Sequence, residues 1–424
     1  MAVVLMVGLL LFFAMGVPIA IALGLSSAIA LLWDGNLSLI ILVQRFFTSI
    51  DSFPLLAIPL FILAGTIMEV GGLSQRLVNF ANAITGHLPG GLGLVMVVTS
   101  LFFSAISGSG AATAAAVGSI LIPSMIARGY HKRFAAALQS ASGELGIILP
   151  PSIPIILYGV TTGTSIGALF LAGVIPGLLI AAGLMIAVYG IAKKRGYKRE
   201  KRATAKEFWT AFREAGLALV MPVIILGGIY LGFFTATEAA GVAVLYAFIV
   251  GFFIYREIKW QKIQDLLASS AITTSVILFI ISSAGLFAWI ITREGIPQQI
   301  AGMFMEISDN PIVFLMIVNV FLIAVGMFME ANALIIILAP LLTPVAMELG
   351  VDPVQFGLIM IINLAIGLCT PPVGVNLFIS AQIAGIRIDE ITLGMIPFYL
   401  VLLTSLVLVT YFPFFTTWLP SLLL

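Results

Sequence analysis

The sequence predicts an all-α polytopic membrane protein, built from two inverted repeats that each contain a re-entrant helical hairpin and a discontinuous helix. Three observations support this fold class. The 424 residues are 61% hydrophobic and only 9% charged, whereas soluble domains are about 25% charged. Two double-proline breaks interrupt long apolar segments at a fixed separation. The loops that correspond to each other around these breaks carry opposite charge.

Composition also excludes several classes of protein. The net charge is +1 and the mean hydropathy is +1.22, so no overall field favours nucleic acid as a partner. The single cysteine, Cys369, excludes a disulfide framework and argues against a structural zinc site. The chain has two histidines, His87 and His131.

Hydropathy divides the chain into many apolar segments. The first has no basic residue before it, so we expect a membrane helix there rather than a cleaved signal peptide. Several segments approach the ~20 residues that span a bilayer. The segments lie near 2–16, 18–33, 53–69, 92–106, 113–127, 134–160, 166–191, 217–233, 237–255, 271–291, 312–327, 333–347, 354–385 and 392–412.

Four of these segments are short and occur in adjacent pairs, within 92–127 and 312–347. At 1.5 Å per residue, about 15 residues reach roughly 22 Å, too little to cross comfortably. We therefore expect two re-entrant hairpins, with tips at 107–113 and 326–333. The stretches 37–50 and 256–266 mix charged and aromatic residues and are expected to be amphipathic arms at the membrane interface.

The two double-proline motifs are LPPSIP at 149–154 and LCTPPVG at 368–374. Pro371 follows Pro150 by 221 residues, and the same offset aligns further Gly, Pro and Leu positions. We infer an internal duplication, against the alternative that Gly and Pro are simply frequent in membrane proteins. The aligned pairs are Leu121 with Leu342, Pro123 with Pro344, Gly129 with Gly350, Gly146 with Gly367, Gly173 with Gly394, and Pro176 with Pro397.

The charges of the loops set the orientation of the repeats. The loop ARGYHKR at 127–133 is basic, and its counterpart ELGVDPV at 348–354 has two acids and no base. Short basic loops stay cytoplasmic, so the equivalent loops face opposite sides and the repeats are inverted. The basic loops 192–206 and 255–262 fall on the same cytoplasmic side, and 293–310 falls outside. Inverted repeats with broken helices are typical of secondary transporters.

The broken helices suggest cation binding. Proline removes a backbone donor, and carbonyls freed within a membrane are tolerable only in protein or beside a cavity. Hard cations accept such oxygen ligands, so we expect one sodium ion where each tip meets its break. The alternative is that these small residues only let helices pack closely. The expected ligands are Ser107, Gly108, Ser109, Gly146, Leu149 and Pro151 in the first repeat, and Gly326, Met329, Gly367, Thr370 and Val373 in the second.

An anionic substrate is expected between the tips, because the positive N-terminal ends of the half-helices converge there. No Lys or Arg lies deep in these segments. The expected substrate-binding residues are Thr113, Ser152, Asn332 and Asn376, with Glu330. Intramembrane acids are functional candidates, so Glu330 could bind an ion or carry a proton. Glu144 and Glu238 could do the same or could cap a helix start.

Four stretches together resemble the large membrane subunit of TRAP transporters, the tripartite ATP-independent periplasmic carriers of the ion transporter superfamily. They are ISGSGAATAAAVGS at 106–119, GELGIILPPSIPIILYG at 143–159, TATEAAGVAVLYA at 235–247 and GLCTPPVGVNLF at 367–378. The resemblance implies sodium-driven import of an organic acid, such as a C4-dicarboxylate, sialic acid or another sugar acid. It also implies an elevator mechanism and a location in the bacterial inner membrane.

The same resemblance implies a small four-helix membrane subunit, expected as a separate polypeptide, and a periplasmic substrate-binding protein. It divides the chain into a scaffold and a transport domain. The expected parts are scaffold helices and arm (1–51), transport domain with hairpin 92–127 and broken helix 134–160 (52–191), a cytoplasmic basic loop (192–216), scaffold helices and arm (217–266), and transport domain with hairpin 312–347 and broken helix 354–385 (267–424).

Other functions fit the residues less well. A carrier of the same superfamily that works without a binding protein is the nearest alternative. GSGA at 108–111 is similar to the serine motif of an intramembrane protease, but that chemistry needs a nearby histidine base, and His87 and His131 lie outside the predicted spans. No GK[ST] follows the glycines, as a phosphate loop would require, and a channel would not need inverted broken-helix repeats. We expect a transporter rather than an enzyme.

Overall fold

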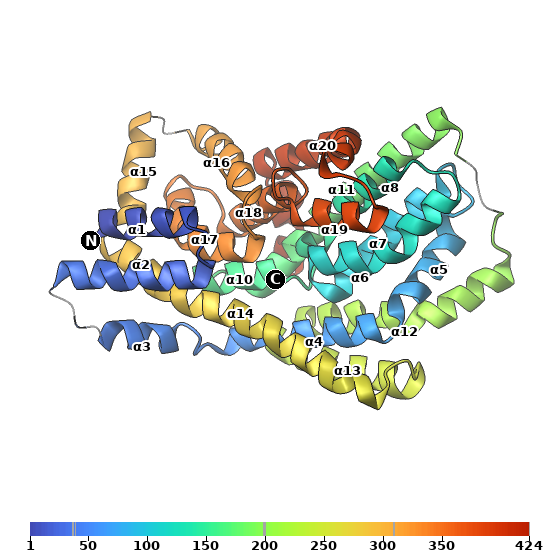
Figure 1. Cartoon of the computed structure of the whole chain (residues 1–424), viewed down its shortest axis with the longest axis horizontal. Helices are drawn as coiled ribbons and strands as arrows, with labels where there is room; N and C mark the ends of the chain where they lie inside the picture. Colours follow the sequence, from blue (N-terminus) through green and yellow to red (C-terminus); the bar gives the residue numbers. More distant parts are fainter. Residues whose placement is uncertain (36–37, 39, 198–200, 308–309, 424) are drawn as a thin grey trace.

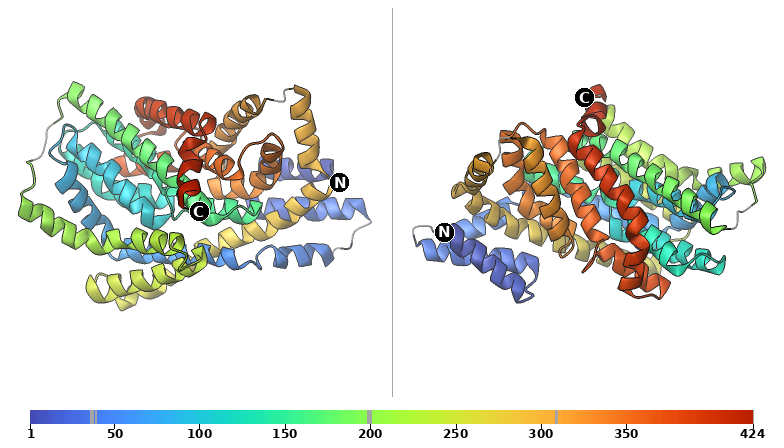
Figure 2. Two further views of the ribbon diagram at one scale, coloured as in Figure 1. Left: turned by 180° about the vertical axis from the view of Figure 1, so that it is seen from behind. Right: turned by 90° about the horizontal axis from the view of Figure 1, so that it is seen from above.

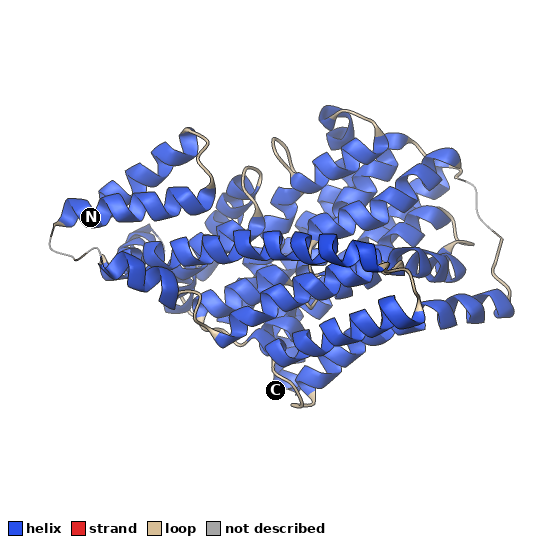
Figure 3. Cartoon of the chain, turned by 60° about the horizontal axis from the view of Figure 1, so that its bottom comes forward, coloured by secondary structure: helices blue, strands red, loops and turns tan. Residues whose placement is uncertain are grey.

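The chain folds entirely into helices over the part that can be described. The computed structural model describes residues 1–35, 38, 40–197, 201–307 and 310–423, and no strand occurs among them (Figure 3). Figure 1 shows the helices packed into an elongated body, with the pair α1 (Ala2–Ala14) and α2 (Ile19–Asp34) at one end. The predicted all-helical class is confirmed.

The first half continues with ten further elements. They are α3 (Ile40–Thr48), the 3-10 turn η1 (Phe53–Leu56), α4 (Ala57–Val70), α5 (Leu73–Thr85), α6 (Gly91–Ser107), α7 (Gly110–Ala127), α8 (Lys132–Gly143), α9 (Leu145–Ile148), α10 (Ile153–Thr162) and α11 (Ile166–Arg195).

The second half repeats much of this order. Its elements are α12 (Ala205–Tyr230), α13 (Ala236–Phe248), the π-helical turn η2 (Ile249–Ile254), α14 (Trp260–Arg293), α15 (Ile296–Ile307), α16 (Pro311–Gly326), α17 (Ala331–Glu348), α18 (Pro353–Leu368), α19 (Val375–Ala384), α20 (Ile388–Tyr411) and α21 (Phe414–Leu423).

The helix bounds follow the internal offset read from the sequence. Both ends of α17 lie 221 residues after those of α7, and the start of α18 lies 221 residues after that of α8. The halves α8–α9 and α10 flank the first double proline, and α18 and α19 flank the second. The peptide bond between the two prolines is cis in both breaks.

Several segments are apolar enough for a membrane. Within the described residues, nine helical segments are long and apolar enough to cross one, among them Ile166–Arg195, Trp260–Arg293 and Ile388–Tyr411. The protein is therefore a multi-pass membrane protein. Gly110–Ala127 and Ala331–Glu348 also reach this length, so the prediction that these hairpin helices are only about 15 residues long was wrong.

The structure differs from the sequence expectation in its amphipathic and connecting segments. α5 and α15 are helices where no element was expected, because their apolar residues alternate with polar ones and lower the average hydropathy. Most of the predicted loop 192–216 is helical, since α11 continues to Arg195 and α12 begins at Ala205. Residues 198–200 and 308–309, within the predicted loops 192–206 and 293–310, lie outside the described residues, as do 37 and 39 of the first arm.

The two expected arms are also unlike each other. The first, α3, is a separate helix with no buried residue. The second is not separate, because Trp260 begins a single helix that continues to Arg293. In Figures 1 and 2 this helix, α14, runs along one side of the molecule, where it contacts α2, α4 and α17.

In each repeat, the half-helix that follows the double proline packs against helices of the other repeat. α10 packs against α17 and α18, and α19 packs against α7 and α8. α20 of the second repeat packs on α8 of the first, and α11 of the first repeat packs on α18 of the second. The two hairpins and the two broken helices therefore form one interleaved body in the middle of the molecule (Figure 2).

A buried tyrosine joins the two repeats within this body. The Tyr158 hydroxyl on α10 donates to the Pro353 carbonyl at 2.8 Å and lies 3.1 Å from the Thr343 hydroxyl on α17. Its ring lies against Gly357 on α18, where an added Cβ would be 2.5 Å from the ring. A buried polar group without a partner costs about 1–3 kcal/mol, so these bonds hold α10 in place against the second repeat.

Replacing Tyr158 by Phe should destabilise the protein by about 1–3 kcal/mol, because the Pro353 carbonyl and the Thr343 hydroxyl lose their shared partner. The melting temperature of purified protein in detergent measures this loss. The matched control is Tyr189→Phe on α11, whose side chain is exposed. Equal melting temperatures for the two variants would show that the link contributes nothing.

Candidate functional site

The first hairpin tip rests directly on the first break. The tip residue Gly108 has a φ of 62°, and its carbonyl accepts a bond from the Ile153 N–H at 3.3 Å. An added Cβ at Gly108 would lie 2.8 Å from the Pro151 carbonyl oxygen. The tip and the break that were predicted to meet are therefore in contact. Glycine is required at position 108 both for the positive φ and for the close approach of the two backbones.

Oxygen atoms converge beside this contact. The Ser107 and Thr113 hydroxyls lie 3.0 Å apart, and the Thr113 hydroxyl donates to the Ser109 carbonyl at 2.9 Å. Gly146 on α9 faces them so closely that an added Cβ would lie 2.7 Å from Thr113 Oγ1 and closer still to the Ser109 carbonyl oxygen.

Two hydroxyls and a carbonyl are a ligand set that suits a hard cation. Binding of an ion would require these oxygens to give up their present hydrogen bonds. Leu149, the remaining predicted ligand of this repeat, ends α9 in an extended conformation and packs its side chain on Gly177.

The second tip meets the second break in a similar way. Gly326 and Gly367 approach each other so closely that a Cβ on Gly367 would lie 2.5 Å from the Gly326 carbonyl carbon. The Val373 N–H donates to the Met327 carbonyl at 3.1 Å. The Thr370 hydroxyl donates to the Ile366 carbonyl at 2.6 Å, within its own helix turn. The structure thus brings the predicted ligands Gly326, Gly367 and Val373 to one tip–break contact.

Met329, the other predicted ligand of the second tip, is half-buried and donates its backbone N–H to the Val325 carbonyl. Val373 is 41% exposed. The predicted ligands of the second repeat are therefore more exposed than those of the first. Fewer of their oxygen atoms lie within hydrogen-bonding distance of one another.

A small cavity of about 50 Å³ lies between the two tips. Both hairpins and both half-helix N-termini contribute to it. That volume holds only a few water molecules, whereas small-molecule pockets are about 300–1,000 Å³. Its lining residues are Gly108, Ser109, Gly110, Ala111, Ile147, Ile153, Pro154, Glu330, Asn332, Leu368, Val375 and Asn376.

Three of the five residues predicted to bind substrate line this cavity, namely Glu330, Asn332 and Asn376. Thr113 and Ser152 are buried outside that lining. Thr113 belongs to the oxygen cluster at Gly146. The Ser152 hydroxyl donates to the Ile147 carbonyl at 2.6 Å and accepts from the Ile155 N–H at 3.4 Å, so it caps α10.

The acids take three different positions. Glu238 forms a capping box with Thr235 at the start of α13, with its carboxylate 2.8 Å from the Thr235 N–H. Glu330 caps α17 and accepts from the Asn332 amide at 2.7 Å. Glu144 is completely buried and accepts from the Asn376 amide at 2.8 Å.

The Glu144–Asn376 contact is a feature that the sequence did not predict. It joins the junction of α8 and α9 in the first repeat to α19 in the second. The second Glu144 carboxylate oxygen has no hydrogen-bond partner among the described residues. With its amide nitrogen bonded to Glu144, Asn376 keeps its carbonyl oxygen free beside the cavity. Two residues 232 positions apart cannot be paired by spacing alone, so no local signal could have revealed this contact.

Comparison with known proteins gives one consistent family. The model of the family described as "Tripartite ATP-independent periplasmic transporter, DctM component" matches residues 6–415. The isethionate TRAP transporter permease protein DctMQ of Oleidesulfovibrio alaskensis is 46% identical over 95% of this chain, which spans 64% of that protein's length. The C4-dicarboxylate TRAP transporter large permease protein DctM of Rhodobacter capsulatus is 41% identical over 96% of both chains.

Another relative is the sialic acid TRAP transporter large permease protein SiaM of Vibrio cholerae, 42% identical over 96% of both chains. Among solved structures, the YdaH transporter of Alcanivorax borkumensis matches with a TM-score of 0.62 over 88% of this chain and 87% of its own. At 16% identity, that match shows a shared fold.

Gly146→Ala should disrupt the oxygen cluster, because the new methyl group would overlap Thr113 Oγ1 and the Ser109 carbonyl. Overpacking of this kind costs about 1–3 kcal/mol, measurable as a lower melting temperature in detergent. Gly190→Ala on α11 is the control, since an added Cβ there meets nothing within 4 Å and should be neutral or slightly stabilising. A Gly146→Ala variant as stable as the control would contradict the close approach.

Proposed function

Because the chain belongs to the family of DctM components of tripartite ATP-independent periplasmic transporters, we propose that it is the large permease of a sodium-coupled importer of an organic acid. The relatives named above transport isethionate, C4-dicarboxylates and sialic acid. These compounds share an anionic acid group. The observation that carries the proposal is the cavity where both hairpin tips and both half-helix N-termini meet.

The charge around the cavity supports coupling to a cation. Glu330 lines it and Glu144 lies directly behind Asn376. No Lys or Arg is among its described lining residues. In its ionised form, either carboxylate would repel an acid anion brought beside it in a low-dielectric interior. Sodium ions at the two tips would offset that repulsion, so the anion binds well only when the cations are present.

Helix ends supply the remaining favourable interaction. Ser152 and Gly374 stand at the N-termini of α10 and α19, and both half-helices begin beside the cavity. The positive dipole ends of both half-helices suit a carboxylate or sulfonate. The start of α19 has no side-chain cap, whereas the first N–H groups of α10 are already bonded to Gly108 and Ser152. The free amide oxygen of Asn376 would accept a bond from a substrate hydroxyl.

The small volume of the cavity requires motion before an acid can bind. A volume of about 50 Å³ is below that of known small-molecule sites, so one tip must move away from the other. The tip at Glu330 and Asn332 is the better candidate, because Val373 at its break is 41% exposed and the second tip–break contact is therefore the more open one.

We also propose the elevator arrangement that the family resemblance implies. α10 and α19 each pack against helices of the opposite repeat, so the two tip sites would move together. Such a unit would move as a whole against the scaffold expected at 1–51 and 217–266, which contains α1–α3, much of α12, α13 and the start of α14. The repeats are inverted in this proposal, with the basic loop at 127–133 in the cytoplasm.

The partners follow from the same proposal. A small four-helix subunit would support the scaffold, and a periplasmic binding protein would deliver the acid to the outer face of the inner membrane. Uptake by this chain without the binding protein would instead indicate a carrier that works alone.

Sodium coupling is tested in liposomes that contain the chain with both partners and a candidate acid outside. Uptake should fall to background when potassium replaces sodium. Unchanged uptake in potassium would exclude sodium as the coupling ion.

Ser107→Ala combined with Thr370→Ala should raise the sodium concentration for half-maximal uptake at least about tenfold. The basis is that a polar contact to a charged group contributes about 1.5–3 kcal/mol. Ser119→Ala is the control, because its hydroxyl bonds only to the Ala116 carbonyl of the same helix. If the double variant keeps the sodium dependence of the control, the tips serve packing only.

Asn332→Asp should weaken substrate uptake at least about tenfold, because it adds a carboxylate to the cavity that receives the anion. The acid concentration for half-maximal uptake measures the effect, with a C4-dicarboxylate, sialic acid and isethionate as probes. Asn79→Asp on the exposed face of α5 carries the same charge change elsewhere. Identical apparent affinities for the two variants would place the substrate away from Asn332.

A further inference from the structure

We propose that the pocket between the start of α8, the end of α11 and the first turns of α20 binds the headgroup of an anionic phospholipid. The pocket has a volume of about 620 Å³ and lies well outside the cavity between the tips. It is lined by His131, Arg133, Phe134, Ile191, Lys194, Arg195, Leu393, Gly394 and Pro397. Basic side chains stand on one part of its wall and apolar side chains on the other.

The pocket is held in shape by the turn that follows α11. Tyr197 stacks on Tyr130 with ring centroids 4.1 Å apart and also contacts Phe134. The Tyr197 hydroxyl accepts from the backbone N–H of His131 at 3.5 Å and from the Arg195 guanidinium at 3.4 Å. The end of α11 is thereby fixed against the start of α8, and the basic groups are held at the rim.

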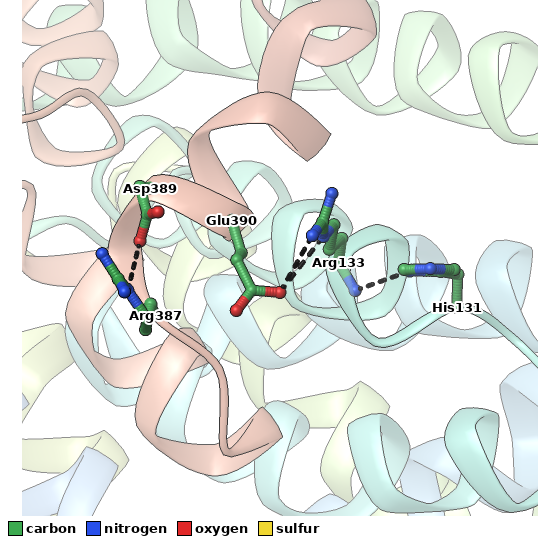
Figure 4. Close-up of polar contacts among 5 residues, drawn as sticks. All are labelled: His131, Arg133, Arg387, Asp389 and Glu390. Atoms are coloured by element: carbon green, nitrogen blue, oxygen red, sulfur yellow. Dashed lines mark hydrogen bonds and ion pairs between the residues drawn. The ribbon is translucent and has the colours of Figure 1, made fainter.

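One of the basic groups is neutralised by an acid. Arg133 pairs with Glu390 at 3.2 Å, and the neighbouring Arg387 pairs with Asp389 at 2.9 Å (Figure 4). Lys194 and Arg195 form no ion pair with any described residue within 4.0 Å. The pocket therefore keeps two positive charges, on Lys194 and Arg195, that no described acid neutralises. A headgroup with one or two phosphate groups would compensate them.

The apolar part of the lining favours a lipid over a soluble anion. Ile191 and Leu393 lie on α11 and α20, both of which are long and apolar enough to cross a membrane. Leu393 is 62% exposed, as expected for a side chain that faces acyl chains. Tyrosines such as Tyr130 and Tyr197 are typical of the membrane–water interface. A headgroup at Lys194 and Arg195 would leave its acyl chains along Ile191 and Leu393.

The charges of the loops place the same pocket in the cytoplasmic leaflet. Its two basic segments are the loop at 127–133 and the end of α11. That leaflet is rich in anionic lipid, and basic pockets between membrane helices on this side bind such headgroups. The pocket lies on α8 and α20, which also support the two breaks, so an occupant would brace the packing of α8 on α20.

The test measures lipid binding to the purified, delipidated chain by native mass spectrometry. Dioleoyl phosphatidylglycerol and cardiolipin are the probes, and dioleoyl phosphatidylcholine is the neutral comparison. The combined Lys194→Ala and Arg195→Ala variant should bind the anionic lipids about thirtyfold more weakly, as expected for the loss of two basic contacts. Its affinity for phosphatidylcholine should not change.

The matched control is the combined Lys201→Ala and Arg202→Ala variant. It removes two exposed charges from the segment between α11 and α12, outside the pocket. It should bind anionic lipids as the unaltered chain does. An equal loss of affinity for anionic lipid in both double variants would contradict the proposed site, because it would indicate attraction to the net charge of the chain alone. A charge-reversed variant, with Lys194→Glu and Arg195→Glu, should abolish the preference for anionic lipid, and a retained preference would also overturn the proposal.

A second arm distinguishes the lipid from a free anion. Cardiolipin should raise the melting temperature of the unaltered chain and of the Lys201/Arg202 control, and inorganic phosphate at the same charge concentration should not. An equal rise with phosphate would show that the pocket takes a soluble anion. A rise in the Lys194/Arg195 variant as large as in the control would likewise contradict the site.

Discussion

The close contact of each hairpin tip with the double-proline break of its own repeat is the constraint on which the rest of the structure depends. A break inside an apolar body leaves backbone groups without helical partners, and an unpaired group there is costly. Hydrogen bonds between each tip and its break reduce this cost. The Gly108 carbonyl accepts from Ile153 in one repeat, and the Met327 carbonyl accepts from Val373 in the other. Glycines at the contact points allow the backbones to approach without side chains between them.

This constraint explains why the sequence predicted the architecture well. Glycine and proline control backbone geometry, so their 221-residue spacing carries information that hydropathy alone does not. The same spacing relates the bounds of α7 and α17. The lengths of the hairpin helices were underestimated because Gly110, Ala111 and Ala331 at the tips are only weakly apolar, yet they are helical once Ser109 and Glu330 cap the turns.

The sequence predicted the site less completely, because its chemistry depends on which helices are neighbours. Asn332, Asn376 and Glu330 line the cavity as expected. Thr113 and Ser152 satisfy backbone and hydroxyl partners instead, a distinction of side-chain direction that position alone does not give. The Glu144–Asn376 bond is wholly non-local. α5 and α15 escaped detection for a different reason, since an amphipathic helix on the surface has no apolar run to mark it.

Because α10 and α19 each pack against the opposite repeat, the two proposed cation sites belong to one packed unit. If each repeat folded as its own body, one tip could exchange ions while the other stayed closed. Here the half-helix of each break packs on the hairpin of the other repeat, and Glu144 bonds across the junction to Asn376 at the cavity. Separation of the repeats would expose a completely buried carboxylate and break the Tyr158 link. The proposed coupling of cations to an acid anion would therefore need no long-range signal, because the charges that must compensate one another would be held in a single packed unit.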